Sequence, residues 1–213
     1  MRRSAVLKSS FVVLMCLGGC AKMSAVDNSR LVLAPDSGKA LVFIARAARP
    51  GSPTVGDGVE GISAIYADDQ FVGLLAPDTH LAVQLAPGQH IFMVVGEKTN
   101  FLRAVAVGES PDFVRADLAP DRTYYIKVEP TSTLALESSF SMEAHNGQFT
   151  AHDLSAWTRT RQYVVNSRGA AWAEKRKHQI SGLKNHFFPK WEAQIAHDKR
   201  EAEKHTLRPD SGK

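Results

Sequence analysis

A short turn motif, Leu-Ala-Pro followed by Asp or Gly, occurs four times in this chain and limits the folds that it can adopt. The copies begin at Leu33, Leu75, Leu85 and Leu118, and each precedes a run rich in β-branched or aromatic residues. Proline has a fixed φ and no backbone N–H, so it ends the ladder of one strand, and the Asp or Gly behind it completes a turn. The copies are spaced irregularly, 42, 10 and 33 residues apart. They therefore predict a recurring entry into strands and not a tandem repeat.

The segments around these turns have the composition and the period of β-strands. Between residues 123 and 129, for example, Tyr124, Ile126 and Val128 alternate with more polar side chains, which is typical of a sheet with one buried and one wet face. The expected strands are residues 40–46, 63–67, 71–75, 81–85, 90–97, 102–108, 113–118, 123–129 and 134–142. Short strands at this spacing predict an antiparallel β-sandwich over residues 39–146.

Four stretches of this region carry a resemblance to a known group of domains. They are GKALVF at residues 38–43, the hairpin IYADDQFVG at 65–73, LAPGQH at 85–90 and RTYYI at 122–126. In them the chain resembles bacterial lipoprotein domains of unknown function that look like PEGA-type sandwiches. The resemblance covers about residues 38–130 and implies an Ig-like or PEGA-like fold. Its motifs are turns and buried strands, so it brings no catalytic residues.

The start of the chain has the layout of a secretory signal peptide. Three basic residues among the first eight precede an apolar run that is too short, at on the order of ten residues, to span a membrane that needs about twenty. The run ends in Leu17-Gly18-Gly19-Cys20, which resembles the lipobox of bacterial lipoproteins. That resemblance implies that Cys20 receives a diacylglycerol, that residues 1–19 are removed, and that the new amino group is acylated. The alternative is a free Cys20 just past an uncleaved or conventionally cleaved signal.

The predicted lipid decides where the protein is placed. Two or three acyl chains on Cys20 are enough for stable anchoring, whereas one is not. Residue 21 is Ala and not the Asp that retains enteric lipoproteins at the inner membrane, so the resemblance implies an outer-membrane anchor on the periplasmic side. An inner-membrane location stays an alternative, because some bacteria also read the residues after position 21, here Lys22. The other cysteine, Cys16, lies within the predicted signal, so the mature chain has no free thiol for chemistry.

The charge of the chain changes sign along its length. Residues 20–158 hold 10 Lys and Arg against 16 Asp and Glu, whereas residues 159–213 hold 13 against 6. A basic tail of this kind predicts an anionic partner, such as lipid head groups, lipopolysaccharide or the cell wall, or an envelope protein. The alternative is that the tail packs on its own acidic domain. Because the expected location is the periplasm, we do not expect nucleic acid as a partner.

The composition after residue 155 predicts two helices. The first runs from about residue 167 to 187 with Asn166 or Ser167 as its N-cap, and Pro189 begins the second because proline disfavours a helical residue before it. Trp172 and Trp191 on these helices need an apolar cover, which is the sandwich, a partner protein or the bilayer interface. The predicted organisation is a signal peptide at residues 1–19, a tether at 20–38, a β-sandwich at 39–146 and a helical basic extension at 155–207.

Several possible catalytic or metal motifs fail on context. The loop at residues 56–61 matches Gly-x-Gly-x-x-Gly, but a strand and not a helix follows it, so it does not predict a dinucleotide site. Gly61 to Ile65 lacks the last Gly of a nucleophile elbow. The histidines have no zinc-ligand spacing, and Asp68-Asp69 lacks the spacing of a calcium loop. We therefore predict no catalytic residue, no cofactor and no metal.

The sequence thus predicts a lipid-anchored, non-catalytic binding or structural module of the cell envelope. Two alternatives stay open. One is an envelope enzyme whose acid and base residues come together from loops at strand ends. The other is a binder of a small ligand or glycan that uses Tyr66, Phe71 and the loop at residues 56–61.

Overall fold

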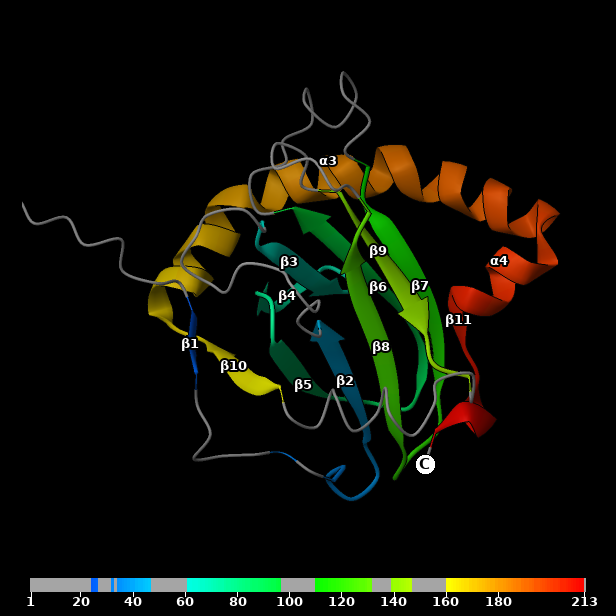
Figure 1. The fold of residues 1–213 in the computed structure, drawn as a ribbon, viewed down its shortest axis with the longest axis horizontal. Coiled ribbons are helices and arrows are strands. Elements are labelled where there is room, and N and C mark those ends of the chain that lie inside the picture. The colour runs from blue at the N-terminus through cyan, green and yellow to red at the C-terminus, as the bar shows by residue number, and fades with distance from the viewer. Residues whose placement is uncertain are drawn as a thin grey trace, which may run out of the picture.

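In the part of the chain that the structure describes, the fold is built from two β-sheets and a long helix (Figure 1). The computed structural model describes residues 24–26, 32, 34–46, 61–96, 110–131, 139–146 and 160–212. The predicted signal peptide and Cys20 lie outside these residues, as does most of the predicted tether. Among the described residues the chain is mainly β. None of the helices described is both long and apolar enough to cross a membrane.

Within the described ranges, the two sheets contain six and five strands. The first has the order β1 (Ser24–Val26), β10 (Arg161–Val165), β5 (Thr79–Leu85), β2 (Ala40–Arg46), β8 (Thr123–Pro130) and β9 (Phe140–Ala144). The second has the order β11 (Thr206–Leu207), β7 (Asp112–Leu118), β6 (Gly88–Gly96), β3 (Ser63–Ala67) and β4 (Gln70–Leu75). The predicted strands therefore recur with shifts of at most two residues. β9 covers the end of the strand expected at 134–142, of which residues 134–138 lie outside the described residues. The predicted strand at 102–108 lies outside the described residues.

The turn motif has the role that its chemistry predicts. Its second, third and fourth copies directly join β4 to β5, β5 to β6 and β7 to β8, and the first precedes β2. Asp78, Gly88 and Asp121 within these copies have positive φ values of 59°, 122° and 57°. The Asp121 carboxylate also accepts a hydrogen bond of 2.7 Å from the backbone N–H of Gly38. Two of the turns are thereby tied together at one end of the sheets.

The prediction of antiparallel sheets is wrong, because both sheets are mixed. β2 and β8 pair in parallel at the centre of the first sheet, and β10 pairs in parallel with β5. In the second sheet β11 pairs in parallel with β7. Two parallel neighbouring strands must be joined by a crossover connection. The connection from β2 to β8 contains β3, β4, β6 and β7, which are strands of the second sheet. β10 and β11 come from the region whose composition predicted only helix.

The core between the sheets follows the alternation of the strands. Tyr124, Ile126 and Val128 of β8 are fully buried there, together with Phe92 of the opposite sheet. The Tyr124 hydroxyl is satisfied, since it accepts from the backbone N–H of Ala119 at 2.7 Å and donates to a carbonyl of the C-terminal segment. The burial pattern predicted for this strand is confirmed.

The C-terminal region contains one long helix, α3 (Ser167–His197), and a short one, α4 (Lys199–Lys204). The Asn166 side chain caps α3 by accepting from two backbone N–H groups, as predicted. The predicted break before Pro189 is wrong, because α3 continues through it. Phe188 and Trp191 on either side of Pro189 both pack on Phe113 of β7, with ring centroids 5.3 and 5.5 Å away. This packing offsets the cost of about 3 kcal/mol of a proline inside a helix.

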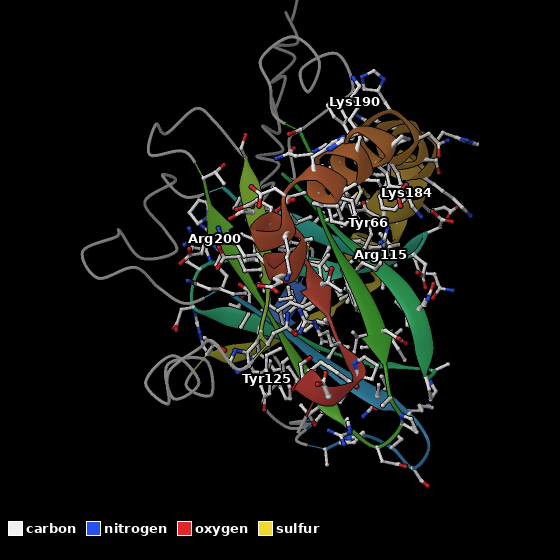
Figure 2. The ribbon with its side chains drawn as sticks, turned by 90° about the vertical axis from the view of Figure 1, so that its right-hand side faces the viewer. Tyr66, Arg115, Tyr125, Lys184, Lys190 and Arg200 are labelled. Atoms are coloured by element: carbon white, nitrogen blue, oxygen red, sulfur yellow. The ribbon has the colours of Figure 1, made fainter. Side chains whose placement is uncertain are left out.

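Helix α3 forms a third layer over the outer face of the second sheet (Figures 1 and 2). Ile180, Leu183, Trp191 and Ile195 are buried against residues of β3, β4, β6 and β7, and Trp172 packs at the edge of the same cluster. The alternative in which the tail packs on its own domain is therefore the one that the structure shows. The sheet is the cover of both Trp172 and Trp191.

Candidate ligand groove

A groove lies between the β3–β4 hairpin and the first half of α3. It has a volume of about 320 Å³. Its walls come from the hairpin, from β6, from the last residue of β10 and from helix residues between 170 and 184. Tyr66 and Phe71, which the sequence marked as binding residues, both line it. Of the rest of that predicted set, Gly56 to Glu60 lie outside the described residues. Gly61 does not line the groove, and its carbonyl accepts from Arg46 at 2.6 Å.

The local fold explains why Tyr66 faces the groove. In β3, Ile65 and Ala67 point into the core between the sheets, whereas Ala64 and Tyr66 belong to the cluster under α3. Asp68 then turns the chain with a positive φ of 54°, which Asp tolerates better than most residues. The hairpin predicted from residues 65–73 is confirmed, and its turn directs Phe71 back toward Tyr66.

Aromatic rings line one end of the groove. The rings of Tyr66 and Phe71 have centroids 5.5 Å apart, and the next ring contact joins Phe71 to Trp172 of α3 at 5.7 Å. The guanidinium of Arg176 lies 4.8 Å from the Trp172 ring centroid, which is a cation–π distance. The aromatic row therefore runs from the sheet to the beginning of the helix.

The hydroxyl of Tyr66 is buried without a hydrogen-bond partner among the described residues. Tyr66 as a whole is only 3% exposed. Burial raises the pKa of Tyr66 to about 12, although Arg176 acts in the opposite direction. The phenol is therefore neutral near pH 7. An unsatisfied buried hydroxyl costs about 1–3 kcal/mol, which a hydrogen-bonding ligand in the groove would recover.

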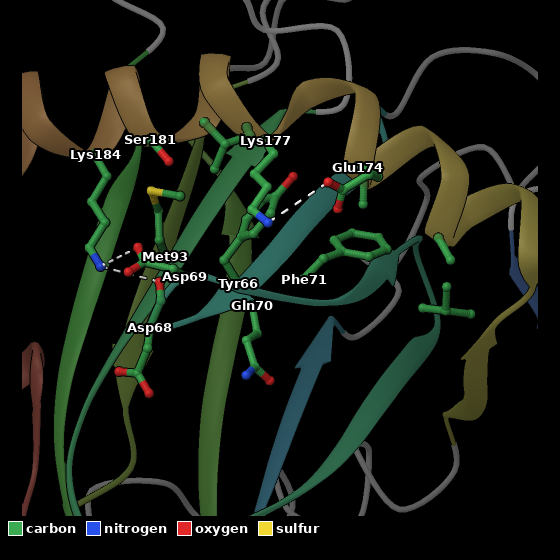
Figure 3. A pocket seen from close by; sticks show the side chains of 14 residues that line it. Tyr66, Asp68, Asp69, Gln70, Phe71, Met93, Glu174, Lys177, Ser181 and Lys184 are labelled. Carbon is green, nitrogen blue, oxygen red and sulfur yellow. Dashed lines mark hydrogen bonds and ion pairs between the residues drawn. The ribbon is translucent and has the colours of Figure 1, made fainter.

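Charged side chains form the rim (Figure 3). Lys184 donates to the Asp69 carboxylate at 2.8 Å and to the backbone carbonyl of Asp68 at 3.3 Å, which fixes the hairpin tip to α3. Lys177 has a looser ion pair with Glu174, at 3.8 Å, and both side chains are well exposed. The rim thus has one tightly held ammonium group and one that is free to turn.

A second hollow, of about 350 Å³, lies at the other half of α3. It contains Asp112, whose carboxylate accepts from the backbone N–H groups of Phe113 at 2.9 Å and Met142 at 2.7 Å. Burial raises the pKa of Asp112, while His205 acts to lower it. His205 Nδ1 donates to the Phe113 carbonyl at 2.9 Å and lies 3.8 Å from Asp112, and Glu201 lies 3.6 Å from Nε2 of the same ring.

Sequence reasoning missed this second cluster. Asp112 and His205 are 93 residues apart in the chain, and no local pattern links a strand start to the residue after α4. The only available signal was the basic, histidine-containing tail, which predicted a partner and not a contact with β7. Among the described residues, no group of three or more His, Cys, Asp or Glu side chains is arranged to hold a metal ion.

The outer side of the C-terminal helices is basic. Lys190 lies on this side, whereas Lys184 lies between α3 and the sheet, near Tyr66 (Figure 2). The exposed cations of the two helices are Arg168, Lys175, Lys177, Lys190, Lys199 and Arg200. These basic side chains are the ones from which we predicted an anionic partner. They stay exposed to solvent although the tail is packed on the sheet.

Comparison with known protein families, with curated proteins and with solved structures found no match. The function is therefore argued from the residues of this chain. Two features carry that argument: the start of the sequence up to Cys20, and the groove beside Tyr66.

Proposed function

We propose that this protein is a lipid-anchored lipoprotein of the bacterial cell envelope that acts as a non-catalytic binding or structural module. The observation that carries the proposal is Leu17-Gly18-Gly19-Cys20 behind a basic and then apolar start. Cys20 is the anchor, and Ala21 supports an outer-membrane position facing the periplasm. The exposed basic side of α3 and α4 supports contact with an anionic envelope partner.

We also propose that the two facing sheets form a sandwich of the Ig-like or PEGA-like kind. The four stretches that carry the resemblance fall on β2, on the β3–β4 hairpin, on the turn before β6 and at the start of β8. These are the turns and buried strands that shape the core. The parallel pairs β2–β8 and β5–β10 set this domain apart from a wholly antiparallel sandwich.

The groove supports binding of a small ligand as the module's activity. Tyr66 and Phe71 stand on the paired strands of the β3–β4 hairpin, and α3 bounds the other side of the groove. A preformed, largely apolar groove with a few directed polar groups is typical of small-molecule sites. The specific observation that favours this function is the Tyr66 hydroxyl, for which the described residues offer no partner.

The enzyme alternative has one observation in its favour, the convergence of Asp112, Glu201 and His205. Both Asp112 oxygens accept from backbone N–H groups, and His205 Nδ1 is held by a backbone carbonyl. These contacts join β7, β9 and the C-terminal segment. We therefore assign the cluster a structural role in the proposed module.

Metabolic labelling with a clickable fatty acid tests the anchor. In a Gram-negative host we expect wild-type protein to incorporate the label and to fractionate with the outer membrane. Cys20→Ser removes the acceptor sulfur and should abolish labelling. Cys16→Ser is the matched control, because it changes the other cysteine within the predicted signal and should keep the label. Equal labelling of wild type and Cys20→Ser, or recovery of unlabelled wild type from the soluble fraction, would contradict the proposal.

A further inference from the structure

We infer that the groove beside Tyr66 binds small apolar carboxylic acids, with the apolar body on the floor of the groove and the carboxylate between the Tyr66 hydroxyl and the Lys177 ammonium group. The inference rests on the proposed binding function and names the ligand class of that site. Three features of the groove carry it: an apolar floor, a buried donor that has no partner among the described residues, and the loosely paired ammonium group of Lys177 on the helix side.

The apolar floor of the groove indicates the size and polarity of the main part of the ligand. Its apolar lining is Phe71, Met93, Val165, Ala170, Ala173 and Ile180, together with the ring of Tyr66. Its volume of about 320 Å³ lies at the small end of the range for ligand pockets, about 300–1,000 Å³. A single aromatic ring or a short acyl chain fits such a site, whereas a large glycan or a cofactor does not.

The Tyr66 hydroxyl determines that the ligand carries an acceptor. The residue is 3% exposed, its oxygen has no partner among the described residues, and it lines the groove. Because burial raises the pKa of Tyr66 to about 12, the group keeps its proton and acts as a donor. Hydrogen bonds from a hydroxyl to an ionised oxygen are among the strongest in proteins, so a carboxylate satisfies this donor better than an alcohol does.

The cations determine that the acceptor is anionic. Lys177 has an exposed ammonium group whose ion pair with Glu174, at 3.8 Å, exceeds hydrogen-bond length, so its three N–H donors can turn to a ligand. Arg176 lies near enough to Tyr66 to favour negative charge on that oxygen. Three carboxylates also line the groove, those of Asp68, Asp69 and Glu174. Asp69 is held by Lys184 at the hairpin tip, and Glu174 is only loosely paired with Lys177. Lys177 and Arg176 therefore supply the positive charge beside Tyr66.

The geometry favours one carboxylate over a larger anion. Lys177 and Lys184 are seven residues apart, or about 10.5 Å along the helix axis, and Lys184 already donates to two oxygens of the hairpin. Besides Lys184, the donors that line the groove are the Tyr66 hydroxyl, the Lys177 ammonium group, the Gln70 amide and the Ser181 hydroxyl. Tyr66 and Lys177 supply donors for the two oxygens of one carboxylate. The carboxylates of Asp68, Asp69 and Glu174 in the same lining disfavour a more highly charged anion such as phosphate.

Calorimetric titration of the full chain carrying Cys20→Ser, which keeps it free of lipid, tests the inference. The probes are 3-phenylpropionate and its uncharged analogue 3-phenylpropanol. We expect 3-phenylpropionate to bind at least about tenfold more tightly, because only it forms the charge-assisted contacts. Its affinity should also fall as salt rises from about 0.05 M to about 0.5 M.

Three variants locate the site. Tyr66→Phe removes only the hydroxyl, and Lys177→Gln removes only the charge, so each should lower the affinity for 3-phenylpropionate about tenfold. Lys175→Gln is the matched control, since Lys175 is exposed on the same helix but does not line the groove, and it should change the affinity less than twofold. Thermal unfolding should show all three variants folded.

The outcomes separate the inference from the proposed function. Equal affinity for the acid and the alcohol, with Tyr66→Phe still weakening one of them, would overturn the carboxylate assignment and leave a binding groove. Binding that none of the variants affects would place the site elsewhere and overturn the inference. No binding of either probe would overturn both the ligand class and the groove as the binding site. The proposed lipid anchor does not depend on this result, because the labelling of Cys20 tests it separately.

Discussion

The two halves of α3 lie on the same sheet but make different kinds of contact with it. The first half bounds an open groove in which the Tyr66 hydroxyl has no partner among the described residues. The second half is closed over Phe113 by Phe188 and Trp191, whose rings stack at 5.5 Å. The sheet beneath is continuous, so the difference comes from the helix. One half leaves room for a ligand, and the other half holds the helix in place.

The C-terminal segment reinforces the closed half. Asn146 donates from its amide to the carbonyls of Glu203 and Thr206 at 2.9 and 2.5 Å. Arg115 of β7 donates to the Glu192 carboxylate at 2.6 Å, and β11 extends the sheet beside β7. Near the midpoint of the helix, Lys184 ties α3 to the hairpin tip through Asp69 and the carbonyl of Asp68. The groove lies beside this contact.

The largest effect should come from the closed half. Trp191→Ala removes a side chain that is 8% exposed, and we expect it to lower the free energy of unfolding by about 3–5 kcal/mol. Trp172→Ala at the open half removes a half-buried ring and should cost less. Urea denaturation of the two variants measures the difference. If Trp172→Ala proved the more costly, the contrast between the halves would be wrong.

The pH dependence of stability should also belong to the closed half. Burial raises the pKa of Asp112 above its ordinary value of 3.8, so the folded protein holds this proton more tightly than the unfolded chain does. Stability should therefore fall as pH rises from 3.8 through the raised pKa. Asp112→Asn cannot ionise and should remove that part of the fall. Urea denaturation at a series of pH values compares the two proteins, and parallel profiles would contradict this role of Asp112.

A smaller effect is expected at the rim of the open half. Lys184→Gln breaks the ion pair with Asp69, a carboxylate whose side chain is 77% exposed, and solvent screens such pairs strongly. We expect a loss of less than about 1 kcal/mol in the free energy of unfolding. Chemical denaturation at low and high salt checks it, because the difference between wild type and variant should shrink as salt rises. If Lys184→Gln lowered the free energy of unfolding by several kcal/mol, the hairpin tip would be held to α3 as firmly as the second half of the helix is held to β7.

The smallest effect should come from Tyr66. Because its hydroxyl has no partner in the described part of the chain, Tyr66→Phe removes an unsatisfied group and loses no hydrogen bond. We expect the free energy of unfolding to stay within about 0.5 kcal/mol of wild type or to rise. Thermal and urea unfolding of the ligand-free protein measure it. A loss above about 1 kcal/mol would show that the hydroxyl is bonded within the protein, and the groove would lose its main donor.

Local chemistry explains how much of the fold the sequence could predict. The strands and their turns were predictable because Pro, Asp and Gly act on their immediate neighbours, as the positive φ values of Asp78 and Asp121 show. The course of α3 through Pro189 was not, because the packing that stabilises it comes from Phe113 in a distant strand. The mixed order of the sheets has the same cause, since β10 and β11 pair with strands far away in the chain.

The same distinction applies to the candidate site. Tyr66 and Phe71 could be selected from the sequence because they flank one predicted hairpin turn. Lys177 and Lys184 could not be assigned to them, since Lys184 lies 115 residues beyond Asp69 in the chain. A hydroxyl without a partner is likewise visible only once the neighbouring elements are in place.

We propose that a lipid on Cys20 anchors this domain to the membrane, and the mass of the mature N-terminal peptide tests this proposal most directly. Protein isolated from the membrane fraction of the host is digested, and its N-terminal peptide is examined by mass spectrometry. We expect the peptide to begin at Cys20, with a diacylglycerol on the sulfur and an acyl chain on the amino group. A peptide that begins at another residue, or an unmodified Cys20, would contradict the account.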